Sequence, residues 1–115
     1  MFGGTKSEKT SASSHTKKSY GSKVLEIDLH IEQLLQKGER LPKEQYLSRQ
    51  LSVFQKELEK ANMQGIQEVI FIHGVGNGIL RNEIHKRLAK SDFIEYFKDA
   101  QKQKFGYGAT MVKIK

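Results

Sequence analysis

The hydrophobic pattern predicts strands that alternate with helices from about residue 24 onward. Residues 24–30 alternate apolar and polar side chains, as a half-buried strand does. In residues 43–64, apolar side chains recur every three or four positions, which predicts a long amphipathic helix that ends at Gly65. A continuous apolar run over residues 69–72 is typical of a strand that is covered on both faces.

The second half of the chain continues this alternation. Helical periodicity returns at residues 79–90, and residues 93–100 then alternate as a strand does. A turn at residues 106–108 leads into a last strand at residues 109–115. The order is strand, short helix, helix, strand, helix, strand, strand, without an internal repeat. This order predicts an α/β fold, namely a two-layer α/β sandwich with a small mixed four-stranded sheet and packed helices.

Composition divides the chain into two parts. Residues 1–23 are rich in Ser, Thr, Lys and Gly and nearly lack apolar side chains, which predicts a disordered basic tail or linker. Residues 24–115 are expected to form the single folded domain. The sequence has no cysteine, which excludes disulfides and thiolate sites, and no apolar run approaches the ~18 residues of a membrane span. We therefore expect a cytoplasmic protein that does not associate with membranes.

The net charge of +7 is concentrated in two regions. The tail carries five lysines and one glutamate, and residues 74–115 carry nine basic and four acidic residues. Residues 24–73, in contrast, carry six basic and eight acidic residues. An excess of positive charge in the part that follows residue 73 suits an anionic partner such as DNA or RNA.

A glycine-rich turn follows the central apolar strand. Its residues are Gly74, Gly76, Asn77 and Gly78, and the second helical pattern opens directly after them. Glycines in such a turn let the backbone come close to a ligand, and a new helix presents unpaired N–H groups. Those donors and the helix dipole favour an anion, most often a phosphate.

Two side chains of suitable chemistry flank this turn. His73 enters it, and Arg81 lies in the first helical turn, so a titratable group and a fixed cation frame the same place. The glycine spacing matches neither the dinucleotide-binding fingerprint nor the phosphate loop of nucleotide hydrolases. The alternative interpretation is a tight strand-to-helix turn in which glycines are needed only because larger side chains do not fit.

Two motifs together resemble a known family. The early strand reads Ile27-Asp28-Leu29-His30, and the later turn reads His73-Gly-x-Gly-x-Gly-x-Leu-Arg81. With these motifs the chain resembles the small MutS-related (Smr) domain, and its closing Gly-Tyr-Gly-Ala-Thr segment from residue 106 is similar to the last turn and strand of that family. The likeness covers about residues 24–115. In particular, the chain resembles a Bacteroidetes branch of large proteins that end in such a domain.

The resemblance implies a nucleic-acid-binding domain, with nicking endonuclease or ribonuclease activity in several relatives. By motif match, Asp28, His30 and His73 form the polar centre. The three glycines of the turn and Arg81 lie against the phosphate backbone. One position departs from the family pattern, because Ile31 stands where a glycine is expected after the Asp-Leu-His sequence.

Phosphodiester cleavage is also plausible from the residues themselves. It needs a base for the attacking oxygen, an acid for the leaving oxygen and positive charge over the phosphate, and histidine can do either proton transfer. We expect His30 and His73 to meet at the strand ends, with Asp28 orienting a histidine. Alternatively, Asp28 caps a neighbouring turn, the histidines are structural, or the three residues hold a metal ion. The sequence specifies no cofactor.

Other residues have weaker signals. Tyr107, between two glycines, is a candidate for base stacking, and Lys86 is a candidate phosphate contact. His85 is expected on the surface of the second helix. The first rival function is a non-catalytic module that docks DNA, RNA or a ribonucleoprotein while another domain of a larger protein does the work. The second rival is a domain that interacts with other protein domains or binds a small nucleotide.

Overall fold

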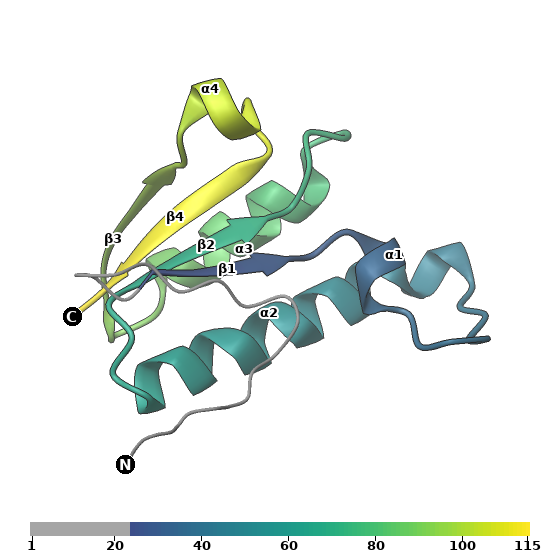
Figure 1. Ribbon diagram of the computed structural model, residues 1–115, viewed down its shortest axis with the longest axis horizontal. Helices are drawn as coiled ribbons and strands as arrows, with labels where there is room; N and C mark the ends of the chain where they lie inside the picture. Colours follow the sequence, from purple (N-terminus) through teal and green to yellow (C-terminus); the bar gives the residue numbers. More distant parts are fainter. Residues whose placement is uncertain (1–23) are drawn as a thin grey trace, which may run out of the picture.

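A computed structural model describes residues 24–115, and the tail predicted for residues 1–23 lies outside them. The four strands are β1 (Val24–Asp28), β2 (Glu68–Ile72), β3 (Ile94–Asp99) and β4 (Ala109–Ile114) (Figure 1). The helices are α1 (Ile31–Leu34), the 3₁₀ helix η2 (Lys43–Gln45), α2 (Tyr46–Met63), α3 (Ile79–Ala89) and α4 (Lys102–Phe105). The predicted architecture of a mixed four-stranded sheet with packed helices is confirmed.

The sheet has the strand order β1-β2-β4-β3. β1 and β2 are parallel, whereas β4 is antiparallel to both β2 and β3. β1, β2 and β3 therefore all run in one direction, and their carboxyl ends lie at the same edge as the first residue of β4. This edge of the sheet is where the chain places its candidate site.

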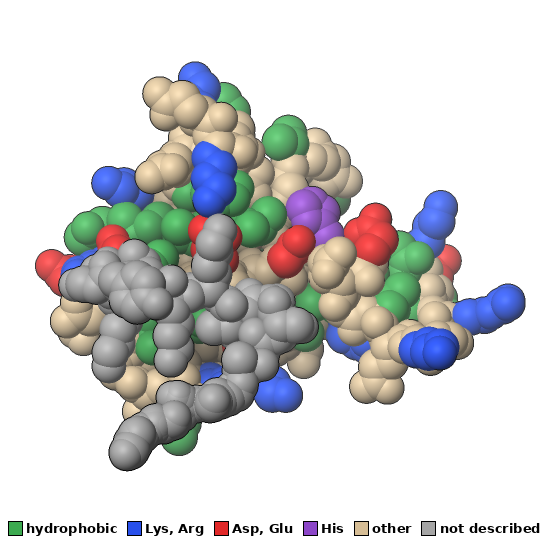
Figure 2. All heavy atoms as spheres, in the orientation of Figure 1, with side chains coloured by type: hydrophobic (Ala, Val, Ile, Leu, Met, Phe, Trp, Pro, Cys, Tyr) green, Lys and Arg blue, Asp and Glu red, His purple; other side chains and the backbone are tan. Residues whose placement is uncertain are grey.

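The surface carries charges of both signs. On the face drawn in Figure 2, lysine and arginine side chains (blue) are scattered, most of them toward the outline, and histidine (purple) and acidic side chains (red) lie among them. The excess of basic residues in the sequence therefore appears on this face as separate side chains rather than as one continuous patch.

Among the described residues, no helix has the length and apolar character that crossing a membrane requires.

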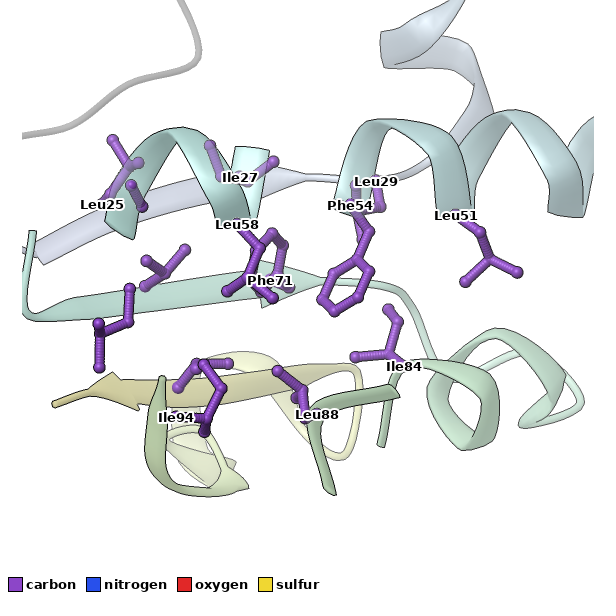
Figure 3. Close-up of a cluster of buried hydrophobic side chains, with 14 residues drawn as sticks. Leu25, Ile27, Leu29, Leu51, Phe54, Leu58, Phe71, Ile84, Leu88 and Ile94 are labelled. Carbon is purple, nitrogen blue, oxygen red and sulfur yellow. The ribbon is translucent and has the colours of Figure 1, made fainter. Parts of the chain in front are cut away.

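One face of the sheet carries the core. The paired residues Leu25, Val69 and Val112 of β1, β2 and β4 are all buried, so these three strands bury the same face. Side chains of α2 and α3 pack against this face (Figure 3). At the centre, the rings of Phe54 and Phe71 meet edge to face with their centroids 4.8 Å apart.

The long helix has the ends that the sequence predicted, apart from its first turn. Pro42 precedes a 3₁₀ turn instead of a first α-helical turn. At the other end Gly65 adopts a left-handed conformation (φ +72°), and the next N–H group, of Ile66, donates to the carbonyl of Ala61 at 3.0 Å. This arrangement satisfies the last carbonyls of the helix, as a glycine C-cap does.

Two features of the β3–β4 hairpin were not predicted. A bulge at Glu95 shifts the register between Ile94 and Tyr96. The connection to β4 contains the short helix α4, where the sequence predicted only a turn. The ammonium group of Lys104 on α4 lies 3.5 Å from the carboxylate of Glu26 on β1, so α4 reaches the opposite edge strand.

The core makes a first prediction. Phe54→Ala should lower the free energy of unfolding by about 3–5 kcal/mol, because it removes a fully buried ring and leaves a cavity beside Phe71. Met63→Ala, at the exposed end of the same helix, should change it by less than about 0.5 kcal/mol. Urea unfolding curves of the two variants measure the difference, and equal losses would contradict this description of the core.

Candidate functional site

The strand directions bring the candidate residues to one edge of the sheet. Asp28 is the last residue of β1, and it is in register with Ile72, the last residue of β2. The same row continues to Ala109, at the start of β4. His30 and His73 each follow one of the two parallel strands, so both lie at neighbouring strand ends, but their side chains form no hydrogen bond with each other.

Asp28 and His30 form a hydrogen-bonded pair. Carboxylate Oδ1 of Asp28 lies 2.8 Å from Nδ1 of His30, and it also accepts the backbone N–H of His30 at 2.9 Å. Asp28 therefore both closes a local turn and orients a histidine, which were the two interpretations of the sequence. Because the ionised carboxylate can only accept, Nδ1 carries the proton, and the exposed ring of neutral His30 keeps Nε2 as an unprotonated nitrogen.

The residues from Gly74 to Gly78, here called the glycine loop, pass directly beside this imidazole. A Cβ atom added to Gly74 would lie 2.8 Å from Nε2 of His30, and Gly74 has a positive φ of +80°. Both space and backbone conformation thus require glycine at this position. The close backbone approach that the glycines were expected to permit is, at Gly74, an approach to His30.

His73 is buried and uses both ring nitrogens. Nδ1 lies 2.9 Å from the carbonyl oxygen of Gly74, and Nε2 lies 2.9 Å from the hydroxyl of Thr110. Since a carbonyl only accepts, Nδ1 must donate, which leaves Nε2 of neutral His73 to accept the single hydroxyl proton of Thr110. His73 was predicted to share proton transfer with His30, but its side chain lies inside the protein and holds the glycine loop.

His85 continues the same chain of hydrogen bonds, so the expectation of a plain surface residue was wrong. Its Nε2 lies 2.8 Å from the hydroxyl oxygen of Thr110. Because that hydroxyl donates to His73, Nε2 of His85 must donate to it. The ring of His85 also packs edge to face on Phe97, with centroids 4.9 Å apart. No local pattern in the sequence indicated this contact.

Burial lowers the pKa of both histidines. Desolvation is the largest cause for His73 and for His85, and the nearby guanidinium of Arg81 lowers the pKa of each further. The two rings are therefore held in the neutral form, which is the form that the hydrogen-bond chain through Thr110 requires.

Arg81 is paired within the protein. Its guanidinium lies 2.8 Å from the carboxylate of Asp99 at the end of β3, and this hydrogen bond holds the pKa of Asp99 below its usual range. The Nε atom of Arg81 is buried without a hydrogen-bond partner among the described residues. Arg81 was predicted to face a phosphate as a free cation, whereas part of its charge is already balanced by Asp99.

The glycine loop leaves several backbone donors open. Gly74, Gly76 and Gly78 all have positive φ angles, and Asn77 caps the following helix by accepting the N–H of Ile79 at 3.1 Å. Apart from the Gly74 N–H, which bonds to Gly108, the loop N–H groups donate to no acceptor in the described part of the chain. Consecutive free N–H groups in such a loop favour a phosphate oxygen.

A cavity of about 310 Å³ adjoins the loop, and its far wall was not predicted from the sequence. One wall consists of His73, the glycine loop and the start of α3. The other wall comes from η2 and the first turns of α2, through Lys43, Tyr46, Leu47 and Gln50. These four side chains are about thirty residues away in sequence, and the amphipathic pattern gave no sign that they face the loop.

The two remaining candidates lie around this centre. Tyr107 is 52% exposed, and the ammonium group of Lys102 lies 4.7 Å from the centre of its ring. Lys86 is exposed on the second half of α3 and pairs with Glu83 at 3.3 Å. Tyr107 precedes Gly108, whose carbonyl accepts the N–H of Gly74, so its exposed ring lies near the glycine loop. Lys86 lies in the last turns of α3, away from the loop. In residues 24–115, no three His, Asp or Glu side chains are grouped so that they could hold a metal ion.

The neutral histidines predict how stability depends on pH. Unfolded histidines take up protons below about pH 6.5, whereas the lowered pKa values of His73 and His85 keep the folded state from doing so. The contribution of these two histidines to the free energy of unfolding should be fully present above about pH 6.5 and should decrease as the pH is lowered toward 5. Urea unfolding at several pH values measures this decrease, which should be smaller in His85→Asn. A profile that is flat in the wild type, or identical in the variant, would contradict the description.

Comparisons with known proteins agree with this fold and its motifs. The endonuclease MutS2 of Aquifex aeolicus is 33% identical over 60 residues, which are 52% of this chain and 8% of that protein. The endonuclease MutS2 of Clostridium acetobutylicum is 36% identical over 58 residues, which are 50% of this chain and 7% of that protein. The chain therefore spans less than a tenth of the length of these relatives.

The similar solved structures include an Smr domain and a stand-alone small MutS-related protein. The Smr domain of Thermus thermophilus MutS2 matches with a TM-score of 0.61 and 28% identity, over 78% of this chain and 96% of that one. YdaL, a stand-alone small MutS-related protein from Escherichia coli, matches in fold with a TM-score of 0.51 and 20% identity, over 88% of this chain and 82% of that one.

The family assignment rests on the second part of the domain. The family model described as the Smr domain matches residues 45–115, which hold the glycine loop, α3 and β4. β1, with Asp28 and His30, precedes the matched residues. Because the match covers more than half of the sequence, this chain belongs to the Smr domain family.

Proposed function

We propose that this domain binds a nucleic-acid strand at the glycine loop and cleaves a phosphodiester bond with His30 as the general base. The observation that carries this proposal is the Asp28–His30 pair. It leaves Nε2 of His30 without a hydrogen-bond partner among the described residues, and this atom faces Gly74. The open N–H groups of the loop provide the phosphate contacts. The MutS2 relatives are named as endonucleases, which agrees with this activity.

The three polar residues then have different roles. A phosphate held by the loop N–H groups lies beside His30, whose Nε2 takes the proton from the attacking water or hydroxyl. The carboxylate of Asp28 stabilises the imidazolium that forms, and the leaving oxygen is protonated from water. His73 acts by positioning, because its Nδ1 proton holds the carbonyl of Gly74. Arg81 adds its partly balanced charge at the start of α3.

The motif resemblance supports a finer assignment. The Bacteroidetes branch has Val-Asp-Leu-His-Ile followed by His-Gly-Val-Gly-Asn-Gly, and this chain has Asp-Leu-His-Ile from residue 28 and the identical second motif from residue 73. We place the domain in that branch, as part of a larger cytoplasmic protein that has other protein or ribonucleoprotein partners. Ile31 is then a feature of the branch.

His30→Ala should lower the rate of cleavage by about 10²–10⁴-fold, because the general base is lost. Affinity for the nucleic acid should stay within about threefold, because His30 is not a ligand of the phosphate. Supercoiled plasmid and a structured RNA are the substrates, read as nicked or shortened products on a gel. Gln33→Ala, at an exposed position of α1 close by, is the control and should cleave at the wild-type rate.

The alternative is a binding module without catalysis, and the position of Ile31 favours it. Ile31 is half-buried and opens α1, where the family motif has a glycine next to the Asp-Leu-His sequence. Retardation of nucleic acid on the gel without products, in the wild type as well as in His30→Ala, would support this alternative and reject cleavage.

Polymer binding also has a salt signature. Several phosphate contacts release several counterions, so the affinity for a 20-base-pair duplex should fall steeply between 50 and 200 mM salt. A domain that takes only one phosphate, such as a free nucleotide, should show a slope near one on a logarithmic plot. Fluorescence anisotropy at four salt concentrations distinguishes the two, and a slope of one would favour the small-nucleotide function.

A further inference from the structure

We propose that the cavity between the glycine loop and α2 binds one unpaired nucleotide, with its base against Tyr46 and its phosphate at the loop. This inference rests on the proposed nucleic-acid binding and adds a substrate class to it. The substrate is a strand with a single-stranded or unpaired position, and a fully paired duplex lacks the group that the cavity accepts.

The two walls of the cavity differ in chemistry in the way that a nucleotide does. The loop wall offers backbone N–H groups without acceptors in the described chain, and the buried Nε of Arg81 lacks a partner as well. The opposite wall offers the half-buried ring of Tyr46 and the aliphatic side chain of Leu47. Phosphate groups need donors, whereas base faces stack on aromatic rings.

Lys43 and Gln50 complete the α2 wall. Lys43 is exposed and forms no ion pair with the described residues, so its charge is available to a phosphate. The side-chain NH₂ of Gln50 donates to the carbonyl of Leu29 at 3.0 Å, which fixes the orientation of the amide. The Oε1 atom of this cavity-lining residue remains an acceptor, which suits the exocyclic amine of a base.

The size of the cavity limits what can enter. A volume of about 310 Å³ is at the lower end for ligand pockets, sufficient for one nucleotide and far too small for a stacked base pair. A base within a duplex has both faces covered by its neighbours, so it must first leave the stack. An unpaired base meets this condition without the cost of breaking a pair.

The position of the cavity relates this subsite to the cleavage site. His73 and Gly74 line it, and Gly74 is also the residue that His30 approaches. A nucleotide seated there has its phosphate in the same loop that faces Nε2 of His30. Recognition of an unpaired position and attack on an adjoining phosphodiester therefore occur on two sides of one short loop.

The test compares two 20-base-pair duplexes, one fully paired and one with a single unpaired 2-aminopurine, by fluorescence anisotropy. Measurements in the His30→Ala background prevent cleavage without changing a residue of the cavity wall. The bulged duplex should bind about tenfold more tightly than the paired one. The fluorescence of 2-aminopurine should also fall on binding, as the base stacks on Tyr46.

Variants of Tyr46 separate stacking from folding. Tyr46→Leu keeps the apolar bulk and should remove the preference while leaving affinity for the paired duplex unchanged. Tyr46→Phe should retain the preference. Tyr96→Leu is the matched control, because Tyr96 is 44% exposed on β3 and does not line the cavity.

Each outcome bears on one of the two proposals. Equal affinity for both duplexes, or an unchanged preference in Tyr46→Leu, would overturn the nucleotide subsite and leave nucleic-acid binding intact. Failure of the protein to bind either duplex would overturn the proposed function, and the subsite with it.

Discussion

The site depends on one backbone carbonyl. The oxygen of Gly108 accepts the N–H groups of both His73 and Gly74, at 2.9 and 2.8 Å. These bonds fasten the chain that leaves β2 to the residue that enters β4, and the two backbones touch so closely that a Cβ on Gly108 would lie 3.3 Å from Gly74. The glycine loop, its distance from His30 and the burial of His73 all follow from this junction.

The junction also gives the two histidines different chemistry. His30 is exposed and has one nitrogen held by a carboxylate, so the other is available to a reactant. His73 is enclosed, and its two nitrogens are used by a carbonyl and a hydroxyl. Similar motif positions at neighbouring strand ends thus produce one residue suited to proton transfer with substrate and one suited to holding the loop.

Much of the fold could be predicted from the sequence, because periodicity reports local structure directly. The alternation of residues 24–30, the spacing of apolar residues before Gly65 and the glycines after residue 73 each correspond to an observed element. The Asp28–His30 pair was also predictable, since an aspartate at the end of a strand readily accepts the backbone N–H two residues on, which brings its carboxylate beside the side chain there. These features depend on near neighbours in the sequence.

The features that were missed depend on distant residues. The insertion of β4 between β2 and β3 brings Thr110 between His73 and His85, and no local pattern encodes this pairing. The pairing of Arg81 with Asp99 follows from the same topology. The loop cavity likewise needs the packing of α2 beside the glycine loop. Because of such non-local contacts, a residue that the sequence places on the surface, such as His85, contacts the residues of the site.

β1 has a further significance as an edge strand. Within residues 24–115 its only neighbour in the sheet is β2, and beyond its end the amide of Gln50 donates to the carbonyl of Leu29. Local opening of this strand would break fewer contacts than unfolding of the whole domain. Such an opening would withdraw Asp28 and His30 together and leave the loop, α3 and β4 in place. The residues that we propose bind the ligand and the pair that we propose reacts with it thus belong to separate segments of the chain, and opening of β1 would part them.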